Sequence, residues 1–184
     1  MLFAIAVTAL AGLLAPLADA AERPEKSVNV VLAGDNLDNS ISIGVSPDGR
    51  QYKIESVAPL EVGGEICWHP EASERDLLCE AAPIAGFEIN GNGGDDTLFL
   101  GATVPVPATL RGGPGNDHLT GGNGDDKLVG GPGEDTLVGR GGNDSLFGGS
   151  EDDNLNGGNG DDKLLGGSGM DVLLGGAGVN ELVQ

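Results

Sequence analysis

Short apolar stretches alternate with polar turn residues along residues 21–90. The stretches are VNVVLAG (28–34), SISIGV (40–45), YKIESV (52–57) and IAGFEI (84–89). Alternation of this length, bounded by Asn, Asp, Gly and Pro, is typical of β-strands that are joined by turns. The pattern therefore predicts an N-terminal β region over residues 21–90.

From residue 112 the pattern changes to a nine-residue repeat, G-G-x-G-x-D-x-L-x, which runs through eight units without a gap. Leucine holds the eighth position of every unit, and aspartate holds the sixth position of every unit except the last, which has Asn180. One further unit, GNGGDDTLF, covers residues 91–99. A flexible glycine-rich linker would not keep leucine in phase, so the repeat predicts a folded array.

Each unit predicts a tight turn followed by a short strand. Glycine permits the positive φ and the close backbone approach that a tight turn requires. In the strand the leucine points to one side and its neighbours point to the other. Two units then form one coil of 18 residues, with strands on opposite walls and leucines meeting between them. Stacked coils predict an all-β fold with parallel strands.

The stacking of coils places the aspartates in two columns. The first column holds Asp117, Asp135, Asp153 and Asp171, and the second holds Asp126, Asp144, Asp162 and Asn180. Stacked carboxylates repel one another unless a cation lies between them. Carboxylate and carbonyl oxygens are hard ligands that suit Ca²⁺, whereas Mg²⁺ requires a tighter octahedron and Zn²⁺ favours Cys or His. The columns therefore predict calcium.

Composition supports a cation as partner. The chain has 29 acidic and nine basic residues, a net charge of −20, and 3% aromatic residues. Such a chain is a poor partner for nucleic acid or an anionic membrane. The same composition favours disorder until the carboxylates are neutralised.

With these residues, the array resembles the RTX, or hemolysin-type, calcium-binding nonapeptide family. The resemblance implies a right-handed parallel β-roll in which the sixth-position aspartates and backbone carbonyls of the turns hold Ca²⁺. The implied side-chain ligands are Asp96, Asp117, Asp126, Asp135, Asp144, Asp153, Asp162 and Asp171. The implied carbonyls include those of Gly113, Gly115, Gly122, Gly124, Gly131, Gly133, Gly158 and Gly160.

Besides Asn180, two residues and one segment depart from the motif. Arg140 replaces a second-position glycine and Glu151 a fourth-position glycine, which predicts looser turns, although Glu151 could add a ligand. The segment LGATVPVPATLR, residues 100–111, carries no such turn and is interpreted as a plain strand arm on the second wall. Asp96 would then lie next to Asp117 in the first column, one coil earlier. Counting the gaps within each column gives several ions, with seven as the upper bound.

The N-terminal residues 1–20 predict a signal peptide, because an apolar run ends at the small-residue site Ala18-Asp19-Ala20. No Lys or Arg precedes this run, so an uncleaved anchor is the alternative. The sequence ends one residue after the last repeat, which makes general secretory export more economical than a C-terminal signal. The expected organisation is a signal peptide (1–20), a β region that caps the roll (21–90) and a β-roll (91–184), secreted or at the cell surface.

Cys67 and Cys79 are the only cysteines. In an exported chain, a close pair favours one disulfide. A metal site with His69 is the alternative, but two Cys and one His at this spacing fit no zinc pattern well.

No catalytic motif is evident. The chain has two histidines and no H-E-x-x-H, and GGSGM lacks the final glycine of a nucleophile elbow. His118 lies at an outward strand position, which favours a solvated histidine. We therefore expect an exported calcium-binding protein with a structural or adhesive role and no enzyme activity. The alternative is an accessory to, or a fragment of, a secreted RTX-type enzyme or toxin.

The ninth position of the repeats faces outward. On the wall of the second column it forms an apolar row of Val129, Phe147, Leu165 and Val183. Aliphatic residues suit strands in general. The row also fits a surface for self-association or for docking of the N-terminal region, because contiguous exposed apolar patches often mark interfaces.

Overall fold

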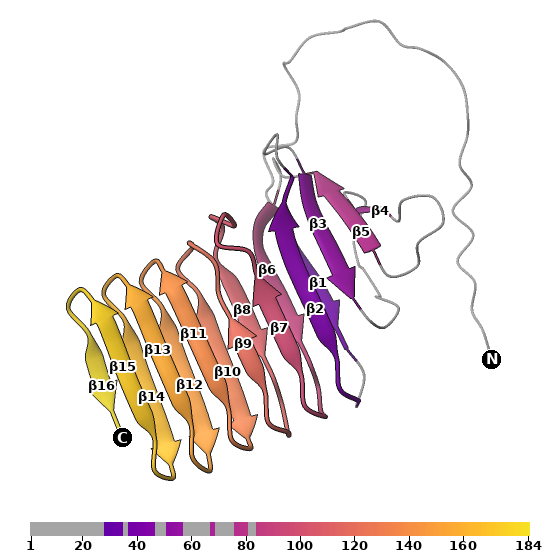
Figure 1. The fold of residues 1–184 in the computed structure, drawn as a ribbon. Coiled ribbons are helices and arrows are strands. Elements are labelled where there is room, and N and C mark those ends of the chain that lie inside the picture. Colours follow the sequence, from indigo (N-terminus) through magenta and orange to yellow (C-terminus); the bar gives the residue numbers. More distant parts are fainter. Residues whose placement is uncertain (1–27, 35–36, 47–50, 57–66, 69–75, 81–83) are drawn as a thin grey trace, which may run out of the picture.

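A computed structural model describes residues 28–34, 37–46, 51–56, 67–68, 76–80 and 84–184. Every regular element in these ranges is a β-strand, and the strands form two sheets (Figure 1). The first sheet contains, in spatial order, β1 (Val28–Ala33), β6 (Ile84–Asn90), β8 (Ala108–Arg111), β10 (Lys127–Pro132), β12 (Ser145–Ser150), β14 (Lys163–Ser168) and β16 (Glu181–Val183). The second contains β15 (Val172–Ala177), β13 (Asn154–Asn159), β11 (Thr136–Gly141), β9 (His118–Thr120), β7 (Thr97–Leu100), β2 (Ser40–Val45), β3 (Gln51–Ser56), β5 (Asp76–Glu80) and β4 (Cys67–Trp68).

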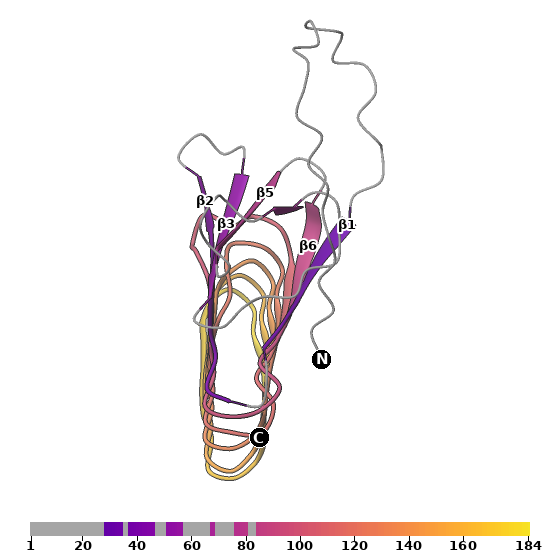
Figure 2. The ribbon, with the colours of Figure 1, turned by 90° about the vertical axis from the view of Figure 1, so that its right-hand side faces the viewer.

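From β6 onward the chain alternates between the two sheets, so one strand from each sheet makes a coil. From β6 onward the neighbouring strands of each sheet are parallel, and from β8 onward residues 18 positions apart are partners, as in Leu128 with Leu146 and Leu137 with Leu155. Viewed along the stack, the coils superpose as a narrow oval whose long walls are the two sheets (Figure 2). The predicted parallel β-roll is confirmed.

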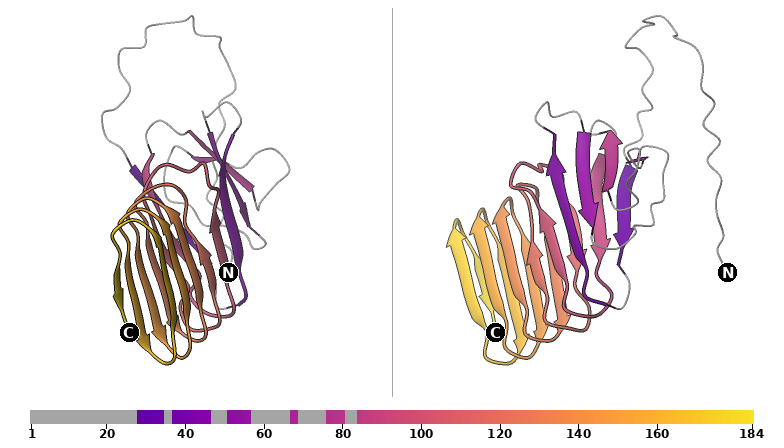
Figure 3. Two further views of the ribbon diagram at one scale, coloured as in Figure 1. Left: turned by 60° about the vertical axis from the view of Figure 1, so that its left-hand side comes forward. Right: turned by 45° about the vertical axis from the view of Figure 1, so that its right-hand side comes forward.

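The roll begins well before the first nonapeptide. β1 pairs in parallel with β6, and β2 pairs in parallel with β7, so these two strands form a coil of their own. β3, β5 and β4 follow as antiparallel strands that extend the second sheet beyond β2 (Figure 3). The boundary that the motif marks at residue 91 therefore falls inside two continuous sheets. β1 and β2 pair with the edges of β6 and β7 that face away from the repeats.

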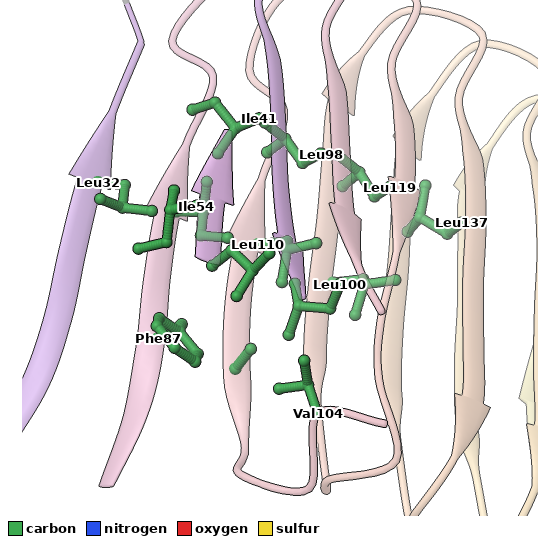
Figure 4. Close-up of a cluster of buried hydrophobic side chains, with 14 of the residues drawn as sticks. Leu32, Ile41, Ile54, Phe87, Leu98, Leu100, Val104, Leu110, Leu119 and Leu137 are labelled. Atoms are coloured by element: carbon green, nitrogen blue, oxygen red, sulfur yellow. The ribbon is translucent and has the colours of Figure 1, made fainter. Parts of the chain in front are cut away.

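The core is a thin layer of side chains between the two walls (Figure 4). In the repeats it consists of the eighth-position leucines, which alternate with exposed or half-buried neighbours along each strand. The fully buried ones are Leu98, Leu119, Leu128, Leu137, Leu146, Leu155 and Leu164. Toward the N-terminal end the layer becomes more varied, with Ile41, Ile54 and an edge-to-face pair of Tyr52 and Phe87. The expected leucine layer thus explains how a glycine-rich chain has a core.

Two sequence expectations concern the N-terminal half. β4 and β5 place Cys67 opposite Cys79, and Cys79 is disulfide-bonded. The expected signal peptide at residues 1–20 lies outside the described residues. Within the described ranges the chain forms no helix of the length and hydropathy needed to cross a bilayer.

Candidate metal centre

The turns between the two sheets lie along two edges of the roll. Turns that lead from the first sheet to the second form the first edge, and turns that lead back form the second edge. The first edge carries the sixth-position residues Asp96, Asp117, Asp135, Asp153 and Asp171, and the second carries Asp126, Asp144, Asp162 and Asn180. These are the two columns that the sequence predicts, with Asp96 above Asp117.

The sixth-position aspartates are buried and link each coil to the coil before it. Oδ1 of Asp135 accepts a hydrogen bond from the backbone N–H of Asp117 at 2.8 Å, and Oδ1 of Asp153 accepts one from Asp135 at 2.8 Å. The second edge repeats this pattern from Asp126 to Asn180. One carboxylate oxygen of each aspartate therefore has a protein partner.

A second ladder, which sequence reasoning missed, runs through the fifth position. Oδ1 of Asn116 accepts from the backbone N–H of Glu134 at 3.0 Å, and Oδ1 of Asp125 accepts from Asn143 at 2.8 Å. Here the acceptor belongs to the earlier coil, the reverse of the sixth position. The signal was present in the sequence, because Asn or Asp fills the fifth position in most units. The ladder's side chains belong to Asp38, Asp95, Asn116, Asp125, Asn143, Asp152 and Asp161.

The other carboxylate oxygen of the sixth-position aspartates, Oδ2, shows whether these residues fit a metal ion. In six turns it is buried and accepts no hydrogen bond: those of Asp117, Asp135, Asp144, Asp153, Asp162 and Asp171. A buried anionic oxygen without a partner is costly and requires a compensating group. The repetition of this feature at one motif position fits a cation as that group.

Backbone carbonyls converge on the same places, as in the gap between turns 112–117 and 130–135. The carbonyl of Gly113 points at Gly131, where a methyl group would lie 2.3 Å from it, and the carbonyl of Gly115 points at Gly133. The carbonyl of Gly130, which belongs to the later of these two turns, faces the earlier turn and accepts a hydrogen bond from the Gly113 N–H at 3.0 Å. Such a gap offers carbonyl and carboxylate oxygens, the donor set of Ca²⁺.

Most of the other glycine carbonyls that the family resemblance implies as ligands also face the next turn along the same edge. Those of Gly124, Gly158 and Gly160 point at the α-carbons of Gly142, Gly176 and Gly178 in the next turn. The carbonyl of Gly122 instead accepts from the Gly141 N–H at 3.3 Å. The first-position glycines are required for space, since a methyl group on Gly130 would lie 2.1 Å from Oδ2 of Asp135.

Burial changes the acidity of these carboxylates. Desolvation raises the pKa of Asp135 and of Asp144 to about 7, more than the backbone hydrogen bonds lower it, and neighbouring acids add to the rise. Desolvation raises the pKa of Asp117, Asp126 and Asp153 to about 6. The ion-free turns therefore hold protons more readily than ordinary aspartates do.

Within the described part of the chain, no group of three or more His, Cys, Asp or Glu side chains gathers around one point. The sixth-position aspartates are spread one per turn along each edge. Each gap therefore has to combine few carboxylates with several carbonyls, which is why the glycine-rich backbone matters as much as the aspartates do.

The irregular turns behave differently from one another. Arg140 and Glu151 adopt the positive φ of the glycines they replace, at 79° and 77°. The charge of the exposed Glu151 adds to the rise in the pKa of Asp135 and of Asp153. Asp126 differs from its equivalents because its Oδ2 accepts from the Gly122 N–H at 2.7 Å.

The fold and the turns define the class: a parallel β-roll whose edges carry stacked, oxygen-lined gaps. The model of the RTX calcium-binding nonapeptide repeat matches the chain in four copies, at residues 88–102, 109–137, 129–164 and 147–182. The chain therefore belongs to the proteins that carry this repeat, and it is a calcium-binding repeat protein. No curated protein and no solved structure matches it.

Proposed function

We propose that this protein is exported and that its repeat array folds on calcium outside the cell, where it has a structural or adhesive role without catalysis. The observation that supports the calcium-dependent part is the set of six buried Oδ2 atoms that accept no hydrogen bond. Calcium supplies positive charge to these stacked oxygens when bound. Residues 90–184 carry fifteen acids and four bases, so neutralisation favours the compact state.

We propose as side-chain ligands of calcium the six aspartates whose Oδ2 is buried and accepts no hydrogen bond: Asp117, Asp135, Asp144, Asp153, Asp162 and Asp171. Asp96 lies at the equivalent place above Asp117, whose Oδ1 accepts the Asp96 N–H at 2.8 Å. Several ions per chain follow from this arrangement, with seven gaps as the upper bound. The remaining donors are the turn carbonyls.

Export is supported by the apolar segment at residues 2–17 and by the small-residue site that follows it. Extracellular calcium is abundant enough for modules of millimolar affinity, whereas cytosolic calcium is not. A chain of this kind would stay expanded inside the cell and fold after export. The disulfide of Cys79 is also typical of an oxidising compartment.

Fractionation of cells that express a C-terminally tagged chain tests the export. We expect the chain in the periplasm or medium, with a mature N-terminus at residue 21. A full-length chain in the cytoplasm would contradict export. The alternative, an accessory to a secreted enzyme, predicts hydrolase activity in the calcium-loaded chain or a co-purifying enzyme.

A further inference from the structure

Arg140 is the one long side chain at a second-position site within the eight-unit array. Its φ of 79° lies in the left-handed region, which disfavours any residue with a Cβ. Non-glycine residues persist in that region where the surrounding structure compensates. The contacts of the Arg140 guanidinium show what compensates for this unfavourable backbone conformation.

The guanidinium of Arg140 crosses two coils. Its Nη1 donates to the carbonyl of Leu100 at 2.6 Å and to the carbonyl of Gly121 at 3.3 Å. The guanidinium carbon also lies 4.5 Å from the centroid of the Phe99 ring, a cation–π contact. A positive charge is therefore held at a fixed point on the second edge.

The two carbonyls belong to one structural position. Phe99 pairs with Thr120 in the parallel register, so Leu100 and Gly121 are equivalent residues of successive coils. Gly121 is the first residue of its repeat. On the first edge, the equivalent carbonyl of Gly130 lines the gap that contains the orphaned Oδ2 of Asp117. Arg140 thus binds the kind of oxygen that lines the calcium gaps.

The gap that Arg140 reaches lies between segment 101–107 and turn 121–126. Segment 101–107 has no acidic residue, and its Val104 is fully buried. In turn 121–126 both carboxylate oxygens of Asp126 are satisfied, Oδ1 by the Ala108 N–H at 2.7 Å and Oδ2 by the Gly122 N–H. This gap therefore leaves no anionic oxygen that calls for an ion.

We infer that Arg140 is a tethered cation that closes the N-terminal end of the second edge, at a gap that does not take calcium. The first carboxylate oxygen on that edge that accepts no hydrogen bond is Oδ2 of Asp144, so calcium there begins at the gap between Asp144 and Asp162. The first edge ends in a related way, because Nδ2 of Asn39 donates to the Gly91 carbonyl at 3.2 Å and to Oδ1 of Asp96 at 3.1 Å. The inference rests on the proposed calcium-dependent folding, and it specifies where calcium binding ends along the second edge.

The test compares the full chain with Arg140→Gly, Arg140→Lys and the control Arg111→Gln. Arg140→Gly restores the motif glycine and frees both carbonyls. Arg111 forms an exposed ion pair with Glu88 at 3.6 Å, so its variant reproduces the loss of one positive charge elsewhere. Native mass spectrometry would count bound Ca²⁺ at saturation, and thermal unfolding would be recorded with calcium and in calcium-free buffer.

We expect Arg140→Gly, Arg140→Lys and Arg111→Gln all to bind the wild-type number of ions, because the gap that Arg140 reaches has no carboxylate oxygen without a hydrogen bond. We also expect Arg140→Gly to lower the unfolding temperature as much in saturating calcium as in calcium-free buffer, since no ion replaces the guanidinium, and Arg111→Gln to leave it nearly unchanged. An additional bound ion in Arg140→Gly, or an unfolding temperature equal to that of the wild type, would overturn the inference. A wild-type chain that binds no calcium would instead overturn the proposed function.

Discussion

The coils before residue 112 and the repeat coils after it share the same two sheets but satisfy their turns differently. In the earlier coils, protein donors such as Asn39 and Arg140 reach the turn oxygens, and the core includes isoleucine, valine and aromatic side chains. In the repeat coils, six buried carboxylate oxygens accept no hydrogen bond, and the core is one leucine per strand.

The difference indicates two sources of stability in one roll. Apolar burial scales with the area removed from water, so the varied N-terminal core has more to contribute per coil. The repeat coils bury one leucine per strand and carry carboxylate oxygens without a hydrogen bond, so we expect them to depend on a bound cation. We expect the first part to fold without calcium and to act as the surface on which the repeat coils stack.

The largest effect is expected from the leucine layer. Leu146→Ala should lower the free energy of unfolding in saturating calcium by about 2–5 kcal/mol, because Leu146 is fully buried between the walls. The matched control is Leu174→Ala, which alters a side chain that is 55% exposed and should change stability by less than about 0.5 kcal/mol. Equal losses in denaturant titrations would contradict the one-leucine core.

A smaller effect is expected from the aspartate columns. Asp135→Ala should raise the calcium concentration at the folding midpoint about tenfold, a change of roughly 1.4 kcal/mol, because Asp135 lies between two gaps. Asn180→Ala should raise it less, because Asn180 borders one gap and carries no charge. Calcium titrations followed by circular dichroism would measure both midpoints. Coincident midpoints would argue against the stacked columns.

The pH dependence should reverse between the ion-free and calcium-loaded forms. Folding raises the pKa of Asp135 and Asp144 from 3.8 to about 7, so the folded ion-free array binds protons more tightly than the unfolded chain does. Its stability is therefore highest near pH 4 and falls as pH rises through 7. With calcium, protons compete with the ion, so the folding midpoint should rise as pH falls from 7 to 5. Circular dichroism of calcium-free protein at pH 5 and pH 8 checks the sign, and greater order at pH 8 would refute it.

The smallest effect is expected on the outer face of the first sheet. Val129, Phe147, Leu165 and Val183 pair in sequence across β10, β12, β14 and β16, so they form one continuous row. Lys127 lies over the Phe147 ring at 5.3 Å. If the row joins two copies, Phe147→Lys should shift calcium-loaded protein from dimer to monomer in sedimentation without changing its folding. Monomers in both proteins would leave the row as an ordinary strand surface.

The repeat region could be predicted closely because each local signal recurs in phase. The strands, the leucine core, the two columns and the strand arm that became β8 all follow from the spacing of Gly, Asp and Leu. The four stretches before residue 91 also match β1, β2, β3 and β6 to within one residue at each end. Alternation identifies strands but not their partners, so the parallel pairing of β1 and β2 with the roll was not predictable.

The contacts of individual side chains were less predictable. The motif marks Arg140 as a departure, but a guanidinium that reaches Leu100 across 40 residues depends on the stacking of three coils. The motif also treats Asp126 as equal to Asp144. Turn 121–126 stacks on segment 101–107, which lacks the repeat turn: the Asn123 N–H donates to the Val104 carbonyl at 2.8 Å, and the Gly122 N–H donates to Oδ2 of Asp126.

Region-resolved hydrogen exchange, with and without calcium, tests the central claim most directly. In calcium-free buffer we expect the backbone amides of residues 112–183 to exchange rapidly, while those of β2, β3, β6 and β7 stay protected. Millimolar Ca²⁺ should protect the amides of the repeat strands, and Mg²⁺ should do so much more weakly. Repeat amides that are equally protected in excess chelator would contradict the account.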